Sequence, residues 1–270
     1  MTAGTATWAS GIPADAGFGV QLSQADQVAT VTLNRPAKRN AQTPLTWAWL
    51  SRTVNALPGT VRVLVVRGEG SSFSAGLDRA LFTPDGIEGI PGVLQLARMG
   101  HDEASAEIAS YQHGLGVFAR PGLVSLALVQ GHAVGAGFQL SLACDVRIAA
   151  SDARFTMAEV SLGLVPDLGG TKRLVELVGY SRAAEICLTG RRVDAAEAER
   201  IGLVSSVVAP DELAAAGERF VASILEKPAS AVAEIKALLL AAADRSQSDQ
   251  ERAEREAQHR QLRVLAGLPE

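Results

Sequence analysis

A glycine-rich segment, GHAVGAGFQLSLACD at residues 131–145, most constrains how this chain can fold. The apolar run at 123–129 precedes it and predicts a strand, and the small and apolar residues after the glycines suit a helix. The segment is therefore typical of a strand, a glycine turn and a helix N-terminus. Such a turn leaves backbone N–H groups unpaired beside the positive end of a helix dipole. We expect a group that carries or develops negative charge to be stabilised there.

The surrounding pattern predicts an α/β protein. Strands are expected near residues 28–33, 61–67, 123–129, 145–149 and 203–208, with helices between them. Hydrophobic residues make up 47% of the 270, enough to bury a sizeable core. Helical patterns alone fill the C-terminal end. We expect a flexible tail over residues 1–17, a core over 18–205 and a C-terminal helical region over 206–270.

Composition and charge exclude several classes of function. The net charge is −4 and no basic block is present, which argues against a nucleic-acid partner. No 18-residue apolar run predicts a membrane span, and residues 1–17 lack the features of a secretory signal. Cys144 and Cys187 lie in apolar helical contexts, which is typical of buried thiols in a reducing compartment. The sequence thus predicts a cytoplasmic protein that does not act at a membrane.

A second turn of small residues, SSFSAGLD at 71–78, follows the strand expected at 61–67. The GxG that precedes it, at residues 68–70, is no dinucleotide fingerprint, because Phe73 stands where the third glycine should be. A nicotinamide-dependent oxidoreductase is therefore a weak alternative. Two such turns could each present an outward N–H, and two convergent N–H donors make an oxyanion hole.

Two carboxylates, Glu159 and Asp167, follow the first turn and lie eight positions apart among apolar residues. Burial would raise the pKa of either one and make it a usable general acid or base near neutral pH. Taken alone, each could instead form a salt bridge or a helix cap. No Ser-His-Asp arrangement and no metal-ligand cluster is apparent. Carboxylates beside an oxyanion hole favour enolate chemistry on a thioester.

Four ordered motifs resemble the crotonase superfamily, the enoyl-CoA hydratases and isomerases. They are SSFSAGLD, GHAVGAGFQLSLACDVRIA, FTMAEVSLGLVPDLGGTKRLVELVG and TGRRVDAAEAERIGLVSSVV, and the likeness runs from about residue 28 to residue 240. The resemblance implies a crotonase-like spiral of ββα units with a C-terminal helical trimerisation region. It also implies an acyl-CoA substrate, no separate cofactor and no metal. The expected assembly is a homotrimer or a dimer of trimers.

The resemblance further implies where the substrate lies. The oxyanion donors are expected to be the backbone N–H groups of Leu77 and Ala136. The adenine and pantetheine are expected to run along residues 35–41 and 75–78, with Lys38 and Arg39 as candidate phosphate partners. The implied substrate-binding set is Arg35, Lys38, Arg39, Ala41, Ala75, Gly76, Asp78, Gly135 and Gly137.

Two positions depart from the pattern of typical hydratases, which carry one glutamate just after the glycine turn and another 20 positions later. Here these positions are Gln139 and Glu159. Gln139 cannot titrate, although it could orient a water or the thioester. Asp167 stands where typical hydratases have glycine, as in members that shift double bonds. The sequence therefore predicts catalysis by Glu159 and Asp167, with Gln139 beside them, and favours a double-bond isomerase.

Three further points follow from the resemblance. Hydration of a 2-enoyl-CoA is the alternative reaction, and a catalytically weak acyl-CoA-binding protein is another, motivated by Gln139. The far wall of the acyl pocket is expected from residues 79–120. No phenylalanine lies near the C-terminus to close over a neighbour's CoA, a role that Arg260 or Arg263 could take.

Overall fold

The computed structural model describes residues 15–16, 19–84, 86–87 and 89–268. Within them, a seven-stranded sheet runs in the order β1-β2-β3-β4-β5-β7-β10, and a three-stranded sheet in the order β6-β8-β9. The large sheet consists of β1 (Asp15–Ala16), β2 (Val20–Ala25), β3 (Val28–Leu33), β4 (Val63–Gly68), β5 (Val124–Val129), β7 (Val146–Ala150) and β10 (Ser206–Val208). The small sheet consists of β6 (His132–Val134), β8 (Arg154–Thr156) and β9 (Arg192–Asp194).

The centre of the large sheet is parallel and buried on both faces. β3, β4, β5, β7 and β10 pair in parallel, whereas β1, β2 and β3 pair antiparallel at one edge. All six residues of β5 are buried, as expected for a parallel strand that reads as a continuous apolar run. Alternate residues of β4 therefore enter two different cores, Leu64 and Val66 on one face and Val63 and Val65 on the other.

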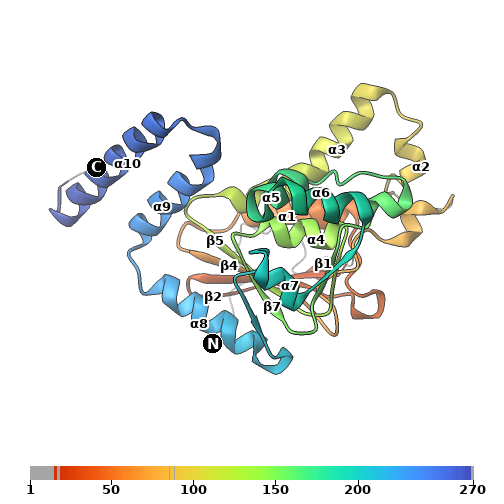
Figure 1. Ribbon diagram of the computed structural model, residues 1–270, viewed down its shortest axis with the longest axis horizontal. Coiled ribbons are helices and arrows are strands. Elements are labelled where there is room, and N and C mark those ends of the chain that lie inside the picture. Colours follow the sequence, from red (N-terminus) through yellow and green to blue (C-terminus); the bar gives the residue numbers. More distant parts are fainter. Residues whose placement is uncertain (1–14, 17–18, 85, 88, 269–270) are drawn as a thin grey trace.

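Helices cover both faces of this sheet (Figure 1). α1 (Pro44–Asn55) and α4 (Ala136–Ala143) pack on the larger core, and α8 (Leu213–Leu225) packs on the smaller one. α9 and α10 lead away from the sheet as a helical arm (Figure 1). The remaining helices are α2 (Val93–Leu96), α3 (His101–Gly116), α5 (Gly170–Val178), α6 (Tyr180–Thr189), α7 (Ala195–Arg200), α9 (Ala229–Ala241) and α10 (Gln247–Leu265).

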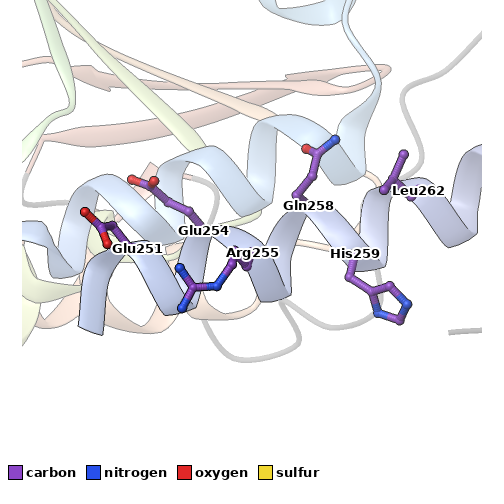
Figure 2. Close-up of a pocket in the computed structure, with 6 residues that line it drawn as sticks. All are labelled: Glu251, Glu254, Arg255, Gln258, His259 and Leu262. Carbon is purple, nitrogen blue, oxygen red and sulfur yellow. The ribbon is translucent and has the colours of Figure 1, made fainter. Parts of the chain in front are cut away.

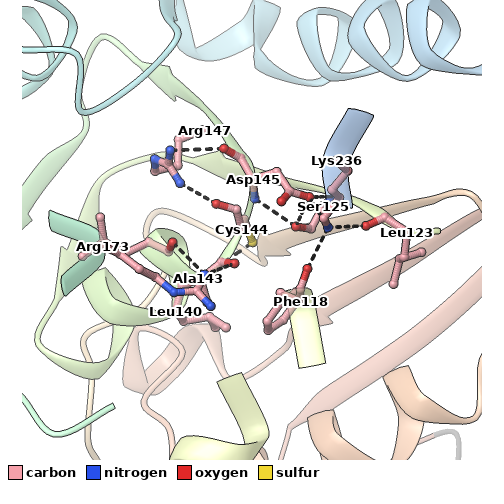
Figure 3. A network of polar contacts seen from close by, with 11 residues as sticks. Phe118, Leu123, Ser125, Leu140, Ala143, Cys144, Asp145, Arg147, Arg173 and Lys236 are labelled. Carbon is pink, nitrogen blue, oxygen red and sulfur yellow. Dashed lines mark hydrogen bonds and ion pairs between the residues drawn. The ribbon is translucent and has the colours of Figure 1, made fainter. Parts of the chain in front are cut away.

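A buried lysine joins the helical arm to the core (Figure 3). The Lys236 side chain of α9 is 8% exposed, and its Nζ donates to the carbonyls of Phe118 (2.8 Å) and Leu123 (2.6 Å). Its third contact is an ion pair of 2.7 Å with Oδ2 of Asp145, just after α4. The same oxygen accepts hydrogen bonds from the backbone N–H and the hydroxyl of Ser125. The arm is therefore fixed to the core by a fully paired buried charge.

The structure corrects the predicted boundaries in two places. Residues 15–16, placed in the flexible tail, form β1 and pair with β2; residues 1–14 and 17–18 of that tail lie outside the described residues. Strand β10 pairs with β7, so the sheet continues past the boundary set at residue 205. Helix α5 begins at Gly170, and the residue before it, Gly169, has a left-handed conformation.

Candidate active site

The first glycine turn joins β6 to α4. Gly135 adopts φ +51° and ψ −118°, which a residue with a side chain rarely adopts, and it precedes the first helical residue, Ala136. Its own N–H donates to the carbonyl of Thr156 at 2.8 Å, which fixes the turn on β8. The N–H of Ala136 opens the helix and has no acceptor within it. The turn therefore leaves this N–H available as a hydrogen-bond donor.

The second turn lies directly against the first. Gly76 has φ +84°, and a Cβ added to it would lie 2.4 Å from the carbonyl oxygen of Val134 and 3.3 Å from the nitrogen of Ala136. The N–H groups of Ala75 and Asp78 donate to backbone carbonyls. That of Leu77 has no hydrogen-bond acceptor in the part of the chain that the structure describes. The structure thus brings the two segments that carry the predicted oxyanion donors, Leu77 and Ala136, next to each other.

The opposite end of α4 carries positive charge (Figure 3). Arg147 donates from Nη1 to the carbonyls of Ser141 (3.2 Å) and Cys144 (2.6 Å). Arg173 of α5 donates to the carbonyls of Leu142 and Ala143. These guanidinium groups satisfy the last carbonyls of the helix and complement the negative end of its dipole. The sequence motifs gave no sign of this arrangement, since backbone carbonyls are the acceptors.

Glu159 and Gln139 contact each other next to the first turn. Nε2 of Gln139 donates to Oε1 of Glu159 at 2.8 Å. A Cβ added to Gly135 would lie 3.2 Å from the same oxygen, so the carboxyl group lies against the turn. The other oxygen of Glu159, Oε2, is buried and has no hydrogen-bond partner among the described residues. A buried acceptor without a partner is costly, which makes this atom a candidate for contact with a substrate.

The surroundings raise the pKa of both carboxyl groups. Burial raises the pKa of Glu159, and the charge of Asp167 adds to that effect, whereas the hydrogen bond from Gln139 opposes it. Burial also raises the pKa of Asp167. The structure therefore brings the two predicted carboxylates within electrostatic reach of each other. Both shifts favour general acid–base behaviour closer to neutral pH than for an exposed carboxyl group.

Helix α3 supplies side chains next to Asp167. Gln112 donates to the backbone carbonyl of Asp167 at 2.8 Å. Tyr111 is 5% exposed, and its ring packs against Trp47 with 5.1 Å between the centroids. Burial raises the pKa of its hydroxyl, as do a polar contact with the carboxylate of Glu107, the charge of that carboxylate and the charge of Asp167. The contact with Glu107 falls short of a hydrogen bond, and the hydroxyl has no hydrogen-bond partner among the described residues. A helix of the segment 79–120 thus contacts the Asp167 loop.

The residues predicted to hold the CoA moiety fall into two groups. Arg35 and Asp78 pair with each other at 2.7 Å, and the carboxylate of Asp78 is nearly buried. Burial works to raise the pKa of Asp78, but the N–H of Ala80 and the charges of Arg35 and Lys38 together lower it. Lys38 lies 3.4 Å from the same carboxylate with its side chain 56% exposed, and Arg39 is also exposed. Arg35 and Asp78 form the first group, which is mostly buried, and Lys38 and Arg39 form the second, which presents its cations to solvent.

A buried polar network that the sequence did not predict supports the second turn. Asn40, with φ +56°, donates to the carbonyls of Glu69 and Ser72 and accepts from the N–H of Arg35. The hydroxyl of Ser74 donates to the carbonyl of Asn40 at 2.8 Å. Ala41 and Ala75 lie half-buried on this loop pair. Gly137 permits close packing there, since a Cβ would lie 2.5 Å from the carbonyl oxygen of Ser74.

Other parts of the described chain offer no competing site. No group of three His, Cys, Asp or Glu side chains is placed to hold a metal ion, and no helix is long and apolar enough to cross a membrane, in these residues. Figure 2 shows a shallow pocket on α10 that contains none of the predicted site residues. Its lining consists of Glu251, Glu254, Arg255, Gln258, His259 and Leu262.

The fold and the two adjoining turns define a crotonase-type protein, and comparison with known proteins gives the same result. The sequence model described as enoyl-CoA hydratase/isomerase matches residues 23–264. The chain therefore belongs to the enoyl-CoA hydratase/isomerase family, which is the crotonase superfamily, and is an enzyme of that family. The prediction of the family is confirmed.

Related proteins are named as hydratases. The chain is 35% identical over 235 residues to a crotonyl-CoA hydratase of Syntrophomonas wolfei, covering 86% of this chain and 84% of the relative. It is 37% identical over 202 residues to a short-chain-enoyl-CoA hydratase of Clostridium acetobutylicum, covering 72% and 70%. A Thermobifida fusca structure assigned to the enoyl-CoA hydratases, in complex with CoA, superposes with a TM-score of 0.87 at 46% identity, covering 93% and 95%. The predicted crotonase-like α/β fold with a helical C-terminal region is confirmed.

Proposed function

We propose that this enzyme acts on acyl-CoA thioesters by forming an enolate at the two glycine turns, with Glu159 as the group that moves the proton. The thioester oxygen would accept hydrogen bonds from the N–H groups of Leu77 and Ala136. The observation that carries the proposal is the unpartnered Oε2 of Glu159, buried beside Gly135. Two N–H donors and the positive end of α4 would acidify the α-carbon, and a buried carboxylate next to them can accept its proton.

The exposed cations next to the second turn suit the phosphates of CoA. Lys38 and Arg39 present charge to solvent, whereas Arg35 is held by Asp78 and the carbonyl of Ala41. Related Thermobifida fusca structures contain CoA and acetoacetyl-CoA, which supports a CoA thioester as the ligand here. Arg35 and Asp78 would then hold the two loops in position, and Lys38 and Arg39 would bind the phosphates of CoA.

Asp167 supports a double-bond shift as the overall reaction. In that reaction Glu159 would remove the α-proton of a 3-enoyl-CoA, and the resulting dienolate would receive a proton from Asp167 at the γ-carbon. The double bond would then lie between the α- and β-carbons. Two carboxyl groups with raised pKa values, close enough to influence each other, fit this exchange. Gln139 cannot act as a second acid.

Hydration of a 2-enoyl-CoA is the second candidate, and the names of the relatives favour it over the double-bond shift. Relatives at 35–37% identity are named as hydratases of crotonyl-CoA, short-chain enoyl-CoA and 2,3-dehydroadipyl-CoA. In hydration Glu159 would take a proton from a water as that water attacks the β-carbon, and would then return the proton to the α-carbon of the enolate. Asp167 would then have no required part in proton transfer.

Separate incubations with 3-enoyl-CoA and 2-enoyl-CoA distinguish these reactions. Mass spectrometry reports a gain of one water for hydration and no mass change for a double-bond shift. The Glu159→Gln enzyme should lose about 10²–10⁴ in rate for either reaction. Isomerisation predicts a loss on Asp167→Asn as well, whereas water addition at an unchanged rate in that variant would rule isomerisation out. Full activity of Glu159→Gln would overturn the whole proposal.

We also propose that the helical arm mediates self-association into trimers or dimers of trimers. Large apolar side chains lie exposed on α9 and α10, among them Leu239 (70%) and Leu265 (82%). Arg260 pairs with Glu234 through two hydrogen bonds of 2.6 and 2.8 Å, which holds α10 against α9. Light scattering on the purified protein should give a trimeric or hexameric mass; a monomeric mass would refute the assembly.

A further inference from the structure

The amide of Gln139 is occupied by protein groups on both of its atoms. Gln139 is 1% exposed and projects from α4. Its Oε1 accepts the N–H of Leu168 (2.9 Å) and of Gly170 (3.3 Å), and its Nε2 donates to Oε1 of Glu159 (2.8 Å). A carboxamide oxygen has two lone pairs, so both are in use. In this arrangement the oxygen is not available to orient a water or the thioester.

A neutral amide satisfies all three contacts at this position without binding a proton. Its oxygen accepts two N–H groups, and its nitrogen donates to a carboxylate. A glutamate could accept from the same N–H groups but could not donate to an ionised Glu159. Two carboxylates at this separation would share a proton, because both cannot ionise so close together. Packing is equally specific, since a Cβ on Gly170 would lie 2.7 Å from Cγ of Gln139.

The same amide connects the two segments that carry the proton-transfer groups. Glu159 begins the 3₁₀ turn Glu159–Leu162, and Leu168 directly follows Asp167 at the start of the loop into α5. Gln139 therefore fixes the position of the Asp167 loop relative to Glu159. Because Oε1 of Glu159 is already an acceptor for this amide, Oε2 is the oxygen left to exchange a proton.

We propose that Gln139 is a positioning residue whose neutral amide sets the separation of Glu159 and Asp167. By occupying Oε1 of Glu159, it leaves Oε2 as the oxygen that exchanges the proton. This inference rests on the proposed function of Glu159. It implies that the residue at 139 determines which protonation state Glu159 holds at neutral pH. The departure from the two-glutamate pattern is then a working part of this site and not a loss of function.

The test is the pH dependence of kcat/KM on an enoyl-CoA substrate, together with the rate of α-proton exchange of a saturated acyl-CoA in deuterated water. Gln139→Glu replaces the amide with a group of the same size. We expect the apparent pKa that governs kcat/KM to rise by at least one pH unit, and exchange at pH 7 to fall at least tenfold. KM should change less than threefold, because Lys38 and Arg39 are untouched. A parental pH profile and exchange rate in Gln139→Glu would overturn the inference.

The exchanged pair, Gln139→Glu with Glu159→Gln, covers the case in which the single variant does not fold. It keeps one amide and one carboxylate in contact, so we expect a melting temperature within a few degrees of the parent and retained CoA binding. The rate of α-proton exchange should fall by at least 10², because the carboxylate at position 139 then accepts hydrogen bonds from the N–H groups of Leu168 and Gly170 and does not face the substrate. Parental activity of the exchanged pair would refute the assignment. Glu159→Gln alone separates the two proposals, since full activity there would overturn the function and not only the role of Gln139.

Discussion

Replacing Gly76 with alanine should damage stability and activity together, for a reason that the geometry makes quantitative. The residue has φ +84°, and the new Cβ would lie 2.4 Å from the carbonyl oxygen of Val134. The left-handed backbone alone costs an alanine about 1–2 kcal/mol. Relieving the overlap adds about 1–3 kcal/mol, since backbone and not a flexible side chain must move. The shift also turns the next N–H, that of Leu77, away from its direction, and losing one oxyanion donor costs about 10²–10³ in rate.

Gly202→Ala is the matched control for this experiment. Gly202 has nearly the same φ, +77°, but its added Cβ would meet only the carbonyl oxygen of Leu177, at an ordinary 3.7 Å. We expect it to lose about 1–2 kcal/mol of unfolding free energy with kcat/KM within twofold of the parent. Urea unfolding and steady-state kinetics on both variants separate the cost of the left-handed backbone, which both share, from the cost of the Cβ overlap, which only Gly76→Ala has. Equal activity of Gly76→Ala and Gly202→Ala would refute the placement of the oxyanion hole at Gly76.

Three other predictions follow from buried polar groups. Asp78→Asn should lower the free energy of unfolding by about 1–3 kcal/mol at pH 7. Because folding lowers the pKa of Asp78 from 3.8, the carboxylate stabilises the fold above that unfolded value, and this contribution is lost as the pH falls through the folded pKa. Urea unfolding at pH 7 and pH 3 should therefore show a smaller stability difference between parent and variant at pH 3. Lys236→Met should cost about 1–3 kcal/mol in chemical unfolding, since the half-buried Asp145 loses its cation and the carbonyls of Phe118 and Leu123 lose their donor, and a loss below 1 kcal/mol would contradict the pairing. Tyr111→Phe should leave the melting temperature unchanged or raise it, because the buried hydroxyl has no partner to lose; a drop of several degrees would reveal a bond that the free enzyme makes.

The parts of the fold that could be predicted are those with a strong apolar pattern. β3, β4, β5 and β7 were expected within two residues of their observed bounds, because buried parallel strands are continuously apolar. β2, with the sequence VQLSQA, was missed because most of its residues lie at the surface and carry no such pattern. Two strands of the small sheet, β6 and β9, have three residues each, too few to show a period.

In the site, side-chain chemistry could be predicted but its partners could not. Glu159, Asp167 and the two glycine turns stood out because acids and glycines are conspicuous among apolar residues. The contacts of Gln139 with the N–H groups of Leu168 and Gly170 have no sequence signature, since every residue except proline carries that donor. For the same reason, the resemblance grouped Arg35 and Asp78 with the substrate-binding residues without indicating that they pair with each other.

The buried Lys236 contact has a consequence for how the molecule can be divided. Figure 1 suggests that α9 and α10 are a detachable appendage, because they lead away from the sheet. Yet a cut between Leu225 and Ala229 would separate Asp145 from its counter-ion, and Asp145 lies just beyond the end of α4 whose other end forms the first turn. A protease that nicks this junction should therefore yield an inactive, unfolding remnant and not a working catalytic core. Turnover and the integrity of the arm are then expected to be lost in one cooperative step.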